Sequence, residues 1–134
     1  MSQKILVIDD EIETLALLGI LLQAAGFEVL KASSPTEGLK LAEQQPHLVL
    51  LDIMMPGMTG WEVCERLRQI APMPIIFVTA LRDAQSQSKG LFLGDDYIVK
   101  PFDTRELIQR VRAHIEREGS PDAKPANPPA EPAV

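Results

Sequence analysis

Five short apolar runs, rich in β-branched residues, alternate along this chain with longer stretches of helical periodicity, and this alternation constrains the fold most. Three of the runs are apolar at every position, as is typical of strands that are covered on both faces. The runs occupy residues 5–8, 27–30, 48–51, 75–78 and 97–99. Strands that helices join in this way form a parallel sheet with right-handed crossovers. We therefore expect an α/β fold in which a doubly wound sheet of five parallel strands carries five helices.

Local signals mark the helices between these runs. Ser34 to Glu37 and Thr59 to Glu62 both have the pattern of a capping box, and the first includes a proline at the first helical position. Asp103 is placed to cap the last helix, and Gly26 to end the first. Apolar residues recur at helical spacing in three stretches, at 12, 15, 18 and 22, at 63, 67 and 70, and at 108, 111 and 115.

The composition changes sharply at Gly119. Residues 119–134 hold five of the eleven prolines and no large apolar side chain before the terminal Val134. Such a segment buries too little surface to offset the entropy lost on ordering it. We therefore expect a domain at residues 1–118, followed by a disordered, proline-rich linker or tail at residues 119–134.

Charge and cysteine content narrow the class of protein further. The net charge of −6 argues against direct binding of nucleic acid by these residues. A single cysteine, Cys64, excludes an internal disulfide framework and fits a reducing cytoplasm. No apolar run approaches the roughly 18 residues that a membrane span needs, and no signal peptide precedes the first run. We expect a cytoplasmic protein without a membrane partner.

Polar residues gather where the expected strands end. Asp9 and Asp10 follow the first run, Asp52 the third, Thr79 the fourth and Lys100 the fifth. In a parallel α/β sheet these positions share the edge where ligands bind. Carboxylates within about 5 Å of one another repel by a few kcal/mol and need a cation, and hard oxygen ligands suit Mg²⁺, for which Mn²⁺ can substitute. With an ammonium and a hydroxyl beside them, they suit the receipt of a phosphoryl group.

Four motifs at these positions resemble those of the receiver domain of bacterial two-component response regulators. They are VIDDE at 7–11, LLDIMMPGMTGWE at 50–62, VTA at 78–80 and DDYIVKPF at 95–102. The resemblance covers residues 1–118 and implies a flavodoxin-like sheet with the strand order 2-1-3-4-5. The run KPFDTRELIQRVRAHIER, which begins at Lys100, is most similar to the last helix of the winged-helix DNA-binding subfamily.

The resemblance assigns roles to the acidic residues. Asp52 would be the phosphoacceptor, which takes phosphorus from a phosphohistidine on a sensor histidine kinase or from a small donor such as acetyl phosphate. Asp9 and Asp10 would hold Mg²⁺ together with Asp52 and the backbone carbonyl of Met54. A domain of this kind is not an enzyme in the ordinary sense, because it catalyses only transfer to its own aspartate and its own dephosphorylation.

The remaining roles concern the phosphoryl group and the response to it. Lys100 would pair with the phosphoryl oxygens, and its peptide bond to Pro101 is expected to be cis. Thr79 would hydrogen-bond one of those oxygens. Tyr97 matches the aromatic residue whose rotamer follows Thr79 and reports phosphorylation to the outer face.

The resemblance also implies partners. The winged-helix subfamily forms phosphorylation-dependent homodimers through its fourth helix, fifth strand and fifth helix, and the residues to test in this chain are Lys89, Asp96, Glu106 and Arg110. The proline-rich tail would lead to an output domain, expected to regulate transcription, that lies outside this chain. The alternatives are a stand-alone regulator and a receiver that docks a partner or acts as a scaffold without phosphate.

Two other classes of protein with related chemistry fit less well. A haloacid dehalogenase-type phosphatase wants a second acid two residues after its nucleophilic aspartate, where this chain has Met54. A flavodoxin-like electron carrier needs a hydroxyl- and glycine-rich phosphate loop after the first strand, where this chain has Asp9, Asp10 and Glu11.

Several other residues are expected to serve packing or the surface. They are His47, His114, Cys64 and Trp61. Residues 94–96 read Gly-Asp-Asp, one small residue fewer than the receiver family usually has, so we expect a tight connection before the fifth strand.

Overall fold

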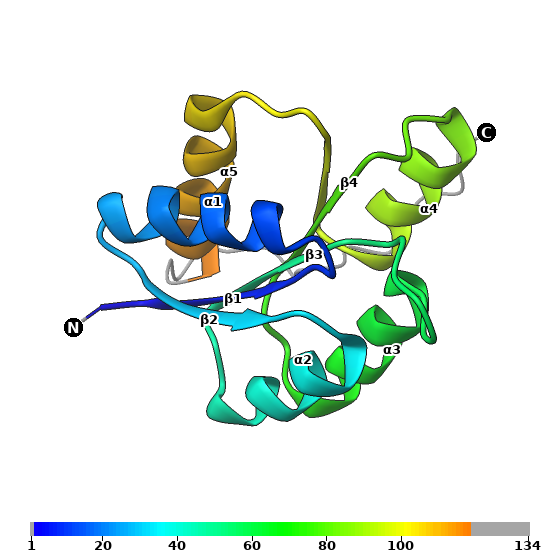
Figure 1. Cartoon of the computed structure of the whole chain (residues 1–134), viewed down its shortest axis with the longest axis horizontal. Coiled ribbons are helices and arrows are strands. Elements are labelled where there is room, and N and C mark those ends of the chain that lie inside the picture. The colour runs from blue at the N-terminus through cyan, green and yellow to red at the C-terminus, as the bar shows by residue number, and fades with distance from the viewer. Residues whose placement is uncertain (1, 119–134) are drawn as a thin grey trace.

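The apolar runs form one parallel sheet with helices on both of its faces (Figure 1). The computed structural model describes residues 2–118, so the proline-rich segment 119–134 lies outside the described residues. The strand order is β2-β1-β3-β4-β5, and every neighbouring pair of strands is parallel. The fold class and the strand order expected from the sequence are confirmed.

Strands and helices alternate along the chain. The strands are β1 (Lys4–Ile8), β2 (Glu28–Ala32), β3 (Leu48–Leu51), β4 (Ile75–Thr79) and β5 (Asp96–Val99). The helices are α1 (Ile12–Ala24), α2 (Pro35–Leu41), α3 (Gly60–Ile70), α4 (Ala84–Leu93) and α5 (Thr104–Glu118), and a 3-10 turn, η1 (Ala42–Gln44), follows α2. Among the helices of the described residues, none has both the length and the apolar character needed to cross a membrane.

Alternate side chains of the strands point to opposite faces of the sheet and build two separate cores. On one face, Leu6, Leu51 and Phe77 pack with α2 and α3. On the other face, Val7 and Leu50 pack with α1 and α5, which lie on the opposite side of the sheet in Figure 1. Because both faces are buried, the central strands consist of unbroken apolar residues.

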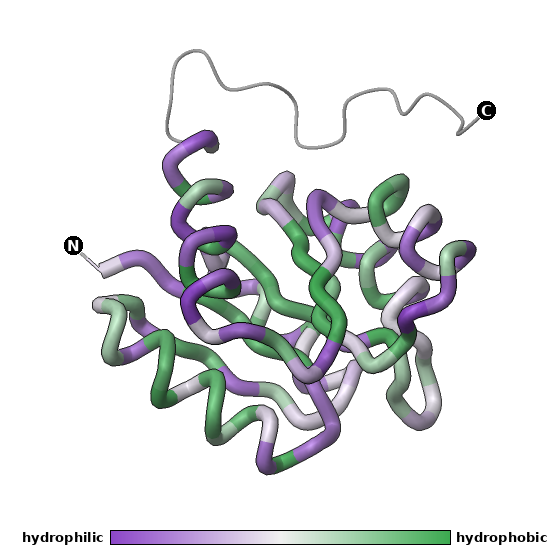
Figure 2. The backbone as a smooth tube through the Cα atoms, turned by 90° about the horizontal axis from the view of Figure 1, so that it is seen from above, coloured by the Kyte–Doolittle hydropathy of each residue, from purple (hydrophilic) through white to green (hydrophobic). Residues whose placement is uncertain are grey.

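The outer surfaces of α1 and α5 differ in polarity. Most exposed side chains of α5 are charged, and the helix is largely hydrophilic in Figure 2. The helix α1 is apolar nearly all round, so Ile12, Leu17 and Ile20 remain exposed after Leu15 and Leu18 have entered the core. The buried stripe of α1 is therefore set by its place on the sheet, not by its own amphipathicity.

The second strand spans Glu28–Ala32 instead of the predicted 27–30. The N–H of Phe27 donates to the carbonyl of Leu22 at 3.0 Å, after Gly26 has turned the chain at a φ of +99°. Phe27 therefore closes the end of α1, in the manner of helices that a glycine terminates, and pairing with β1 starts one residue later.

Side chains cap three helices where the sequence indicated. The capping box at 59–62 is complete at α3, and Asp103 caps α5. At α2, Ser34 accepts the N–H of Glu37, but the Glu37 carboxylate accepts the N–H of Ser33 at 2.7 Å. The first predicted box is thus only half formed, because Ser33 offers both its N–H and its hydroxyl to that carboxylate.

The connection between α4 and β5 is short and is tied to its neighbours by a buried ion pair. The carboxylate of Asp95 accepts from Arg68 at 2.8 Å and from the N–H of Ile75 at 2.8 Å. Arg68 also donates to the carbonyl of Met73 at 2.7 Å. One arginine of α3 therefore fixes both the α3–β4 and the α4–β5 connections.

Gly60 determines how closely α3 approaches the end of β3. A Cβ at this position would meet the carbonyl oxygen of Asp52 and lie 2.6 Å from the Cα of Ile53. We predict that Gly60→Ala lowers the free energy of unfolding by about 2 kcal/mol in urea denaturation, because backbone must shift. The control is Gly19→Ala, whose Cβ would meet only the flexible Lys31 side chain at 3.3 Å and should change stability by less than about 1 kcal/mol. Equal losses at the two positions would contradict this account.

Candidate functional site

The carboxyl ends of four strands bring together the polar side chains that the sequence singled out. Asp9 follows β1 and Asp52 follows β3, and the N–H of Asp52 donates to the carbonyl of Ile8 at 3.0 Å. Thr79 ends β4, and its carbonyl accepts the N–H of Lys100 at 2.8 Å. Backbone hydrogen bonds between neighbouring strands therefore hold these residues side by side.

Three carboxylates stand together at this edge of the sheet. Asp9, Asp10 and Asp52 each offer an oxygen, and these oxygens lie within 4.8 Å of one another. Asp9 and Asp52 are only 2% and 4% exposed. Burial raises the pKa of Asp9 above its ordinary value, although hydrogen bonds from Lys100 and the N–H of Glu11 act in the opposite direction. Such a set of oxygen ligands fits a hard divalent cation of the kind expected from the sequence.

Lys100 supplies positive charge to these carboxylates. Its Nζ donates to Asp9 at 2.8 Å, to Glu11 at 2.7 Å and to Asp52 at 3.0 Å. Burial alone would lower the pKa of Lys100, but the three hydrogen bonds outweigh it and raise the pKa, so the ammonium stays charged. The peptide bond between Lys100 and Pro101 is cis.

Glu11 also contacts Lys100, although the polar residues at the strand ends do not predict this contact. It lies one residue beyond the aspartate pair, immediately before α1. The hydrogen bond from Lys100 lowers the pKa of Glu11 below its ordinary value. The signal that could have found this residue is the glutamate that ends the motif VIDDE.

Met54 lies two residues after Asp52 and contacts it through its backbone. The N–H of Met54 donates to the Oδ1 of Asp52 at 3.2 Å, while the Oδ2 of Asp52 accepts from Lys100. The side chain of Met54 is exposed, so only its backbone holds Asp52. The two oxygens of Asp52 are therefore held by different donors, and this fixes the plane of its carboxylate.

Thr79 and Tyr97 are connected through one residue of the loop after β4. The Oγ1 of Thr79, which is fully buried, accepts the N–H of Leu81 at 3.4 Å. The hydroxyl of Tyr97 donates to the carbonyl of Leu81 at 2.7 Å. Burial raises the pKa of Tyr97 to about 12, so its hydroxyl keeps the proton that this bond needs. Tyr97 lies against Gly90 of α4, which places it between the site and that helix.

Three of the four residues singled out for a dimer face form a charged cluster within the chain. Arg110 donates to Asp96 at 2.9 Å and pairs with Glu106 at 3.0 Å. His114, a residue that we expect to serve packing or the surface, lies 3.1 Å from the other oxygen of Asp96. Burial would raise the pKa of Asp96, but its bonds to His114, to the N–H of Tyr97 and to Arg110 lower it.

The fourth residue, Lys89, lies elsewhere. Its Nζ is 4.7 Å from the centre of the Trp61 ring, so it is turned toward α3. Trp61 in turn packs edge-on against Phe77 of the core, with ring centres 5.2 Å apart. Cys64 is buried in the same region, and burial raises the pKa of its thiol to about 11. Trp61 and Cys64 are thus packing residues, as expected.

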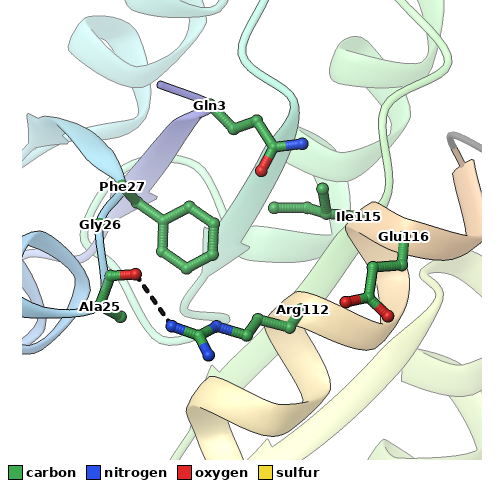
Figure 3. Close-up of a pocket in the computed structure, with 7 residues that line it drawn as sticks. All are labelled: Gln3, Ala25, Gly26, Phe27, Arg112, Ile115 and Glu116. Atoms are coloured by element: carbon green, nitrogen blue, oxygen red, sulfur yellow. Dashed lines mark hydrogen bonds between the residues drawn. The ribbon is translucent and has the colours of Figure 1, made fainter. Parts of the chain in front are cut away.

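Figure 3 shows a separate pocket at the amino-terminal end of the strands, whereas Asp9, Asp10 and Asp52 lie at the carboxyl end. It is bordered by Gln3, which precedes β1, and by residues of the turn before β2 and the end of α5. Arg112 donates to the carbonyl of Ala25 at 2.9 Å and lies 6.0 Å from the centre of the Phe27 ring. These contacts join α5 to the end of α1. None of them involves the carboxylates, Thr79 or Lys100 at the carboxyl ends of the strands.

The comparisons with known proteins agree with one another. Residues 5–112 match the family described as the response regulator receiver domain. A probable transcriptional regulator, ycf27, of Cyanophora paradoxa is 44% identical over 122 residues, which make up 90% of this chain and 51% of that protein. A similar protein of Porphyridium aerugineum is 44% identical over 87% of this chain and 49% of its own length. This chain therefore spans about half the length of the curated relatives it matches.

A solved structure shows the same likeness at the level of the fold. The receiver domain protein of Clostridium thermocellum superposes with a TM-score of 0.82 at 33% identity, over 87% of this chain and 97% of that one. Fold, motifs and relatives therefore point to the same family.

Removal of the Lys100 charge should destabilise the protein in a pH-dependent way. We predict that Lys100→Met lowers the free energy of unfolding by about 3 kcal/mol at pH 8 with a chelator present, because Asp9 and Asp52 then lack a cation. Burial already raises the pKa of Asp9, and loss of the hydrogen bond from Lys100 raises it further, so the variant is penalised least at low pH, where this carboxyl is protonated, and loses stability as pH rises through the folded-state pKa of Asp9. The deficit should therefore be smaller at pH 5, as urea denaturation can show. An equal deficit for Lys40→Met, an exposed lysine, would contradict this.

Proposed function

Because the chain belongs to the family of response regulator receiver domains, we propose that it accepts a phosphoryl group on Asp52 and changes its outer face in response. The observation that carries the proposal is the meeting of two buried aspartates, Asp9 and Asp52, with Lys100 at the carboxyl edge of the sheet. Asp52 is therefore a nucleophile held in a fixed orientation. The ammonium of Lys100 beside it can stabilise the negative charge of the phosphorylated product.

The transfer balances without any further reactant. A bond forms between a carboxylate oxygen of Asp52 and phosphorus, while the bond from phosphorus to the donor breaks. With acetyl phosphate the acetate oxygen keeps the electron pair, and with phosphohistidine the imidazole nitrogen keeps it. Lys100 balances the negative charge that arrives. Mg²⁺, held by Asp9, Asp10, Asp52 and the carbonyl of Met54, would neutralise charge on the phosphoryl oxygens when bound.

The contacts of Leu81 support a route from the site to the outer face. A phosphoryl group adds about 1.5–2 negative charges, and the hydroxyl of Thr79 is the nearby donor that can turn toward it. The bond from Leu81 to Thr79 would then be lost, and the carbonyl of Leu81 that holds Tyr97 would move with its loop. A switch of this kind needs only a few kcal/mol when the active state is already populated at about 0.1–10%.

The partners of the proposed switch follow from the family and the relatives. A sensor histidine kinase would supply the phosphoryl group. The relatives named as probable transcriptional regulators are about twice as long as this chain, which supports a transcriptional output domain beyond it, and the resemblance of α5 to the winged-helix subfamily favours that type. We place the protein in the cytoplasm, and we regard it as a self-modifying switch and not as an enzyme with turnover.

Phosphorylation by a small donor tests the proposal. After incubation with acetyl phosphate and Mg²⁺, intact mass spectrometry should show one phosphoryl group on the wild-type chain. The adduct should be absent from Asp52→Asn and from wild-type protein treated with a chelator. An adduct that persists in Asp52→Asn would contradict the assignment. A wild-type chain that accepts phosphate from neither a small donor nor a kinase would favour the alternative, a receiver that docks a partner without phosphate.

We also propose that the phosphorylated chain forms a homodimer through α4, β5 and α5. Two large apolar residues of α4, Leu91 and Phe92, are 56% and 57% exposed. Successive residues of a helix are turned by about 100°, and Gly90 faces Tyr97 while Lys89 faces Trp61, so Leu91 lies on the side of α4 away from α3. The cluster of Arg110, Asp96 and Glu106 supplies a polar border to this apolar surface.

Sedimentation velocity with beryllofluoride, a phosphoryl mimic, and Mg²⁺ tests the dimer. We predict that Leu91→Ser weakens dimerisation about tenfold, because an apolar anchor is lost from the interface, and that Arg110→Glu weakens it as well. The matched control is Ile20→Ser, which removes an apolar residue of comparable exposure from α1, on the face of the sheet opposite to α4. Dimerisation that survives in both α4 and α5 variants, or fails equally in the control, would remove this idea.

A further inference from the structure

The ammonium of Lys100 has no donor to spare in this structure. An ammonium carries three N–H donors and accepts nothing. The described contacts of Nζ are three carboxylates, at 2.8 Å to Asp9, 2.7 Å to Glu11 and 3.0 Å to Asp52. A phosphoryl group on Asp52 can take over the donor that Asp52 itself accepts, and a second donor becomes available to its oxygens only when Asp9 or Glu11 gives up its contact.

The three carboxylates differ in how easily they can leave. Asp9 and Asp52 are buried and follow central strands of the sheet, and the second oxygen of each accepts a backbone N–H. The side chain of Glu11 is 61% exposed and reaches Lys100 from the surface. An exposed ion pair is weak because water solvates the separated carboxylate nearly as well, so Glu11 is the partner that leaves at least cost.

The local structure around Glu11 agrees with this role. Glu11 occupies the N-cap position of α1, yet its side chain makes no capping hydrogen bond to that helix. Its carboxylate lies instead against Lys100, with a longer contact to the hydroxyl of Thr14 at 3.4 Å. The start of α1 therefore does not depend on this carboxylate, which is free to move.

We infer that Glu11 is a removable counter-ion that occupies a second Lys100 donor, one that the phosphoryl oxygens can use, and that it thereby holds back phosphorylation of the resting protein. This inference rests on the proposed function and adds a residue that regulates the same site. Glu11 acts through Lys100 and is a positioning residue. Its departure frees one N–H of Lys100, and its negative charge opposes the arriving phosphoryl group as long as it stays.

Binding of beryllofluoride in the presence of Mg²⁺ tests the inference by calorimetry on the whole chain. Glu11→Gln should bind beryllofluoride about two- to fivefold more tightly than wild type, the range expected for the loss of one exposed ion pair. Because the competing attraction is between charges near the surface, the gain should shrink as salt is raised. A merely structural role would not produce this salt dependence. The matched control is Glu13→Gln, which removes the same charge from an exposed position in the first turn of α1.

The outcomes separate this inference from the proposed function. Tighter, salt-dependent binding in Glu11→Gln alone supports the inference. Unchanged or weaker binding in Glu11→Gln, or an equal gain in Glu13→Gln, overturns it and leaves the proposed function standing, since wild-type protein still binds the probe. Wild-type protein that does not bind beryllofluoride overturns both.

Discussion

The ion pairs of Lys100 with the carboxylates at the strand ends are the interaction on which the rest of the structure depends. Two nearly buried aspartates beside each other are unfavourable unless a cation compensates them, and Lys100 reaches both. The parallel sheet makes this arrangement possible, because it ends its strands along one edge and leaves the side chains of the following residues close together. The two cores, one on each face, in turn hold the strands in that order.

The arrangement also explains how a change at the site can reach the surface. Thr79 ends β4 inside the site, and Tyr97 lies on β5 under α4, with Leu81 bonded to both. The connections at the opposite edge are tied by the buried pair of Arg68 and Asp95. Movement is therefore easier in the loop after β4 than at the amino-terminal ends of β4 and β5, and the outer face next to that loop is the one we expect to respond.

Most of the fold and the strand-end residues of the site can be predicted from the sequence. Physical reasons explain why the edge of β2, the long-range ion pairs and Glu11 cannot. The central strands are buried on both faces, so their apolar runs were unambiguous, and the residues that follow them converge by topology. The range predicted for the edge strand β2 begins and ends too early, because Phe27 is apolar and Lys31 is charged. The N–H of Phe27 instead bonds to the end of α1, and the strand continues through Lys31. Pairs such as Arg68 with Asp95 join residues far apart in the chain and leave no local pattern. Glu11 does not stand out in the sequence because it lies two residues beyond the pair of Ile8 and Asp9 at the strand end and reaches Lys100 only through its long side chain.

The most direct test of the central claim is to locate the phosphoryl group chemically. Borohydride reduces an aspartyl phosphate to homoserine, which peptide mapping can place in the sequence. After treatment with acetyl phosphate and Mg²⁺, the account predicts homoserine at position 52 alone, with Asp9 and Asp10 unchanged. Homoserine at either of those positions, or a phosphoryl group that resists borohydride on another type of residue, would contradict the assignment of Asp52 as the phosphoacceptor.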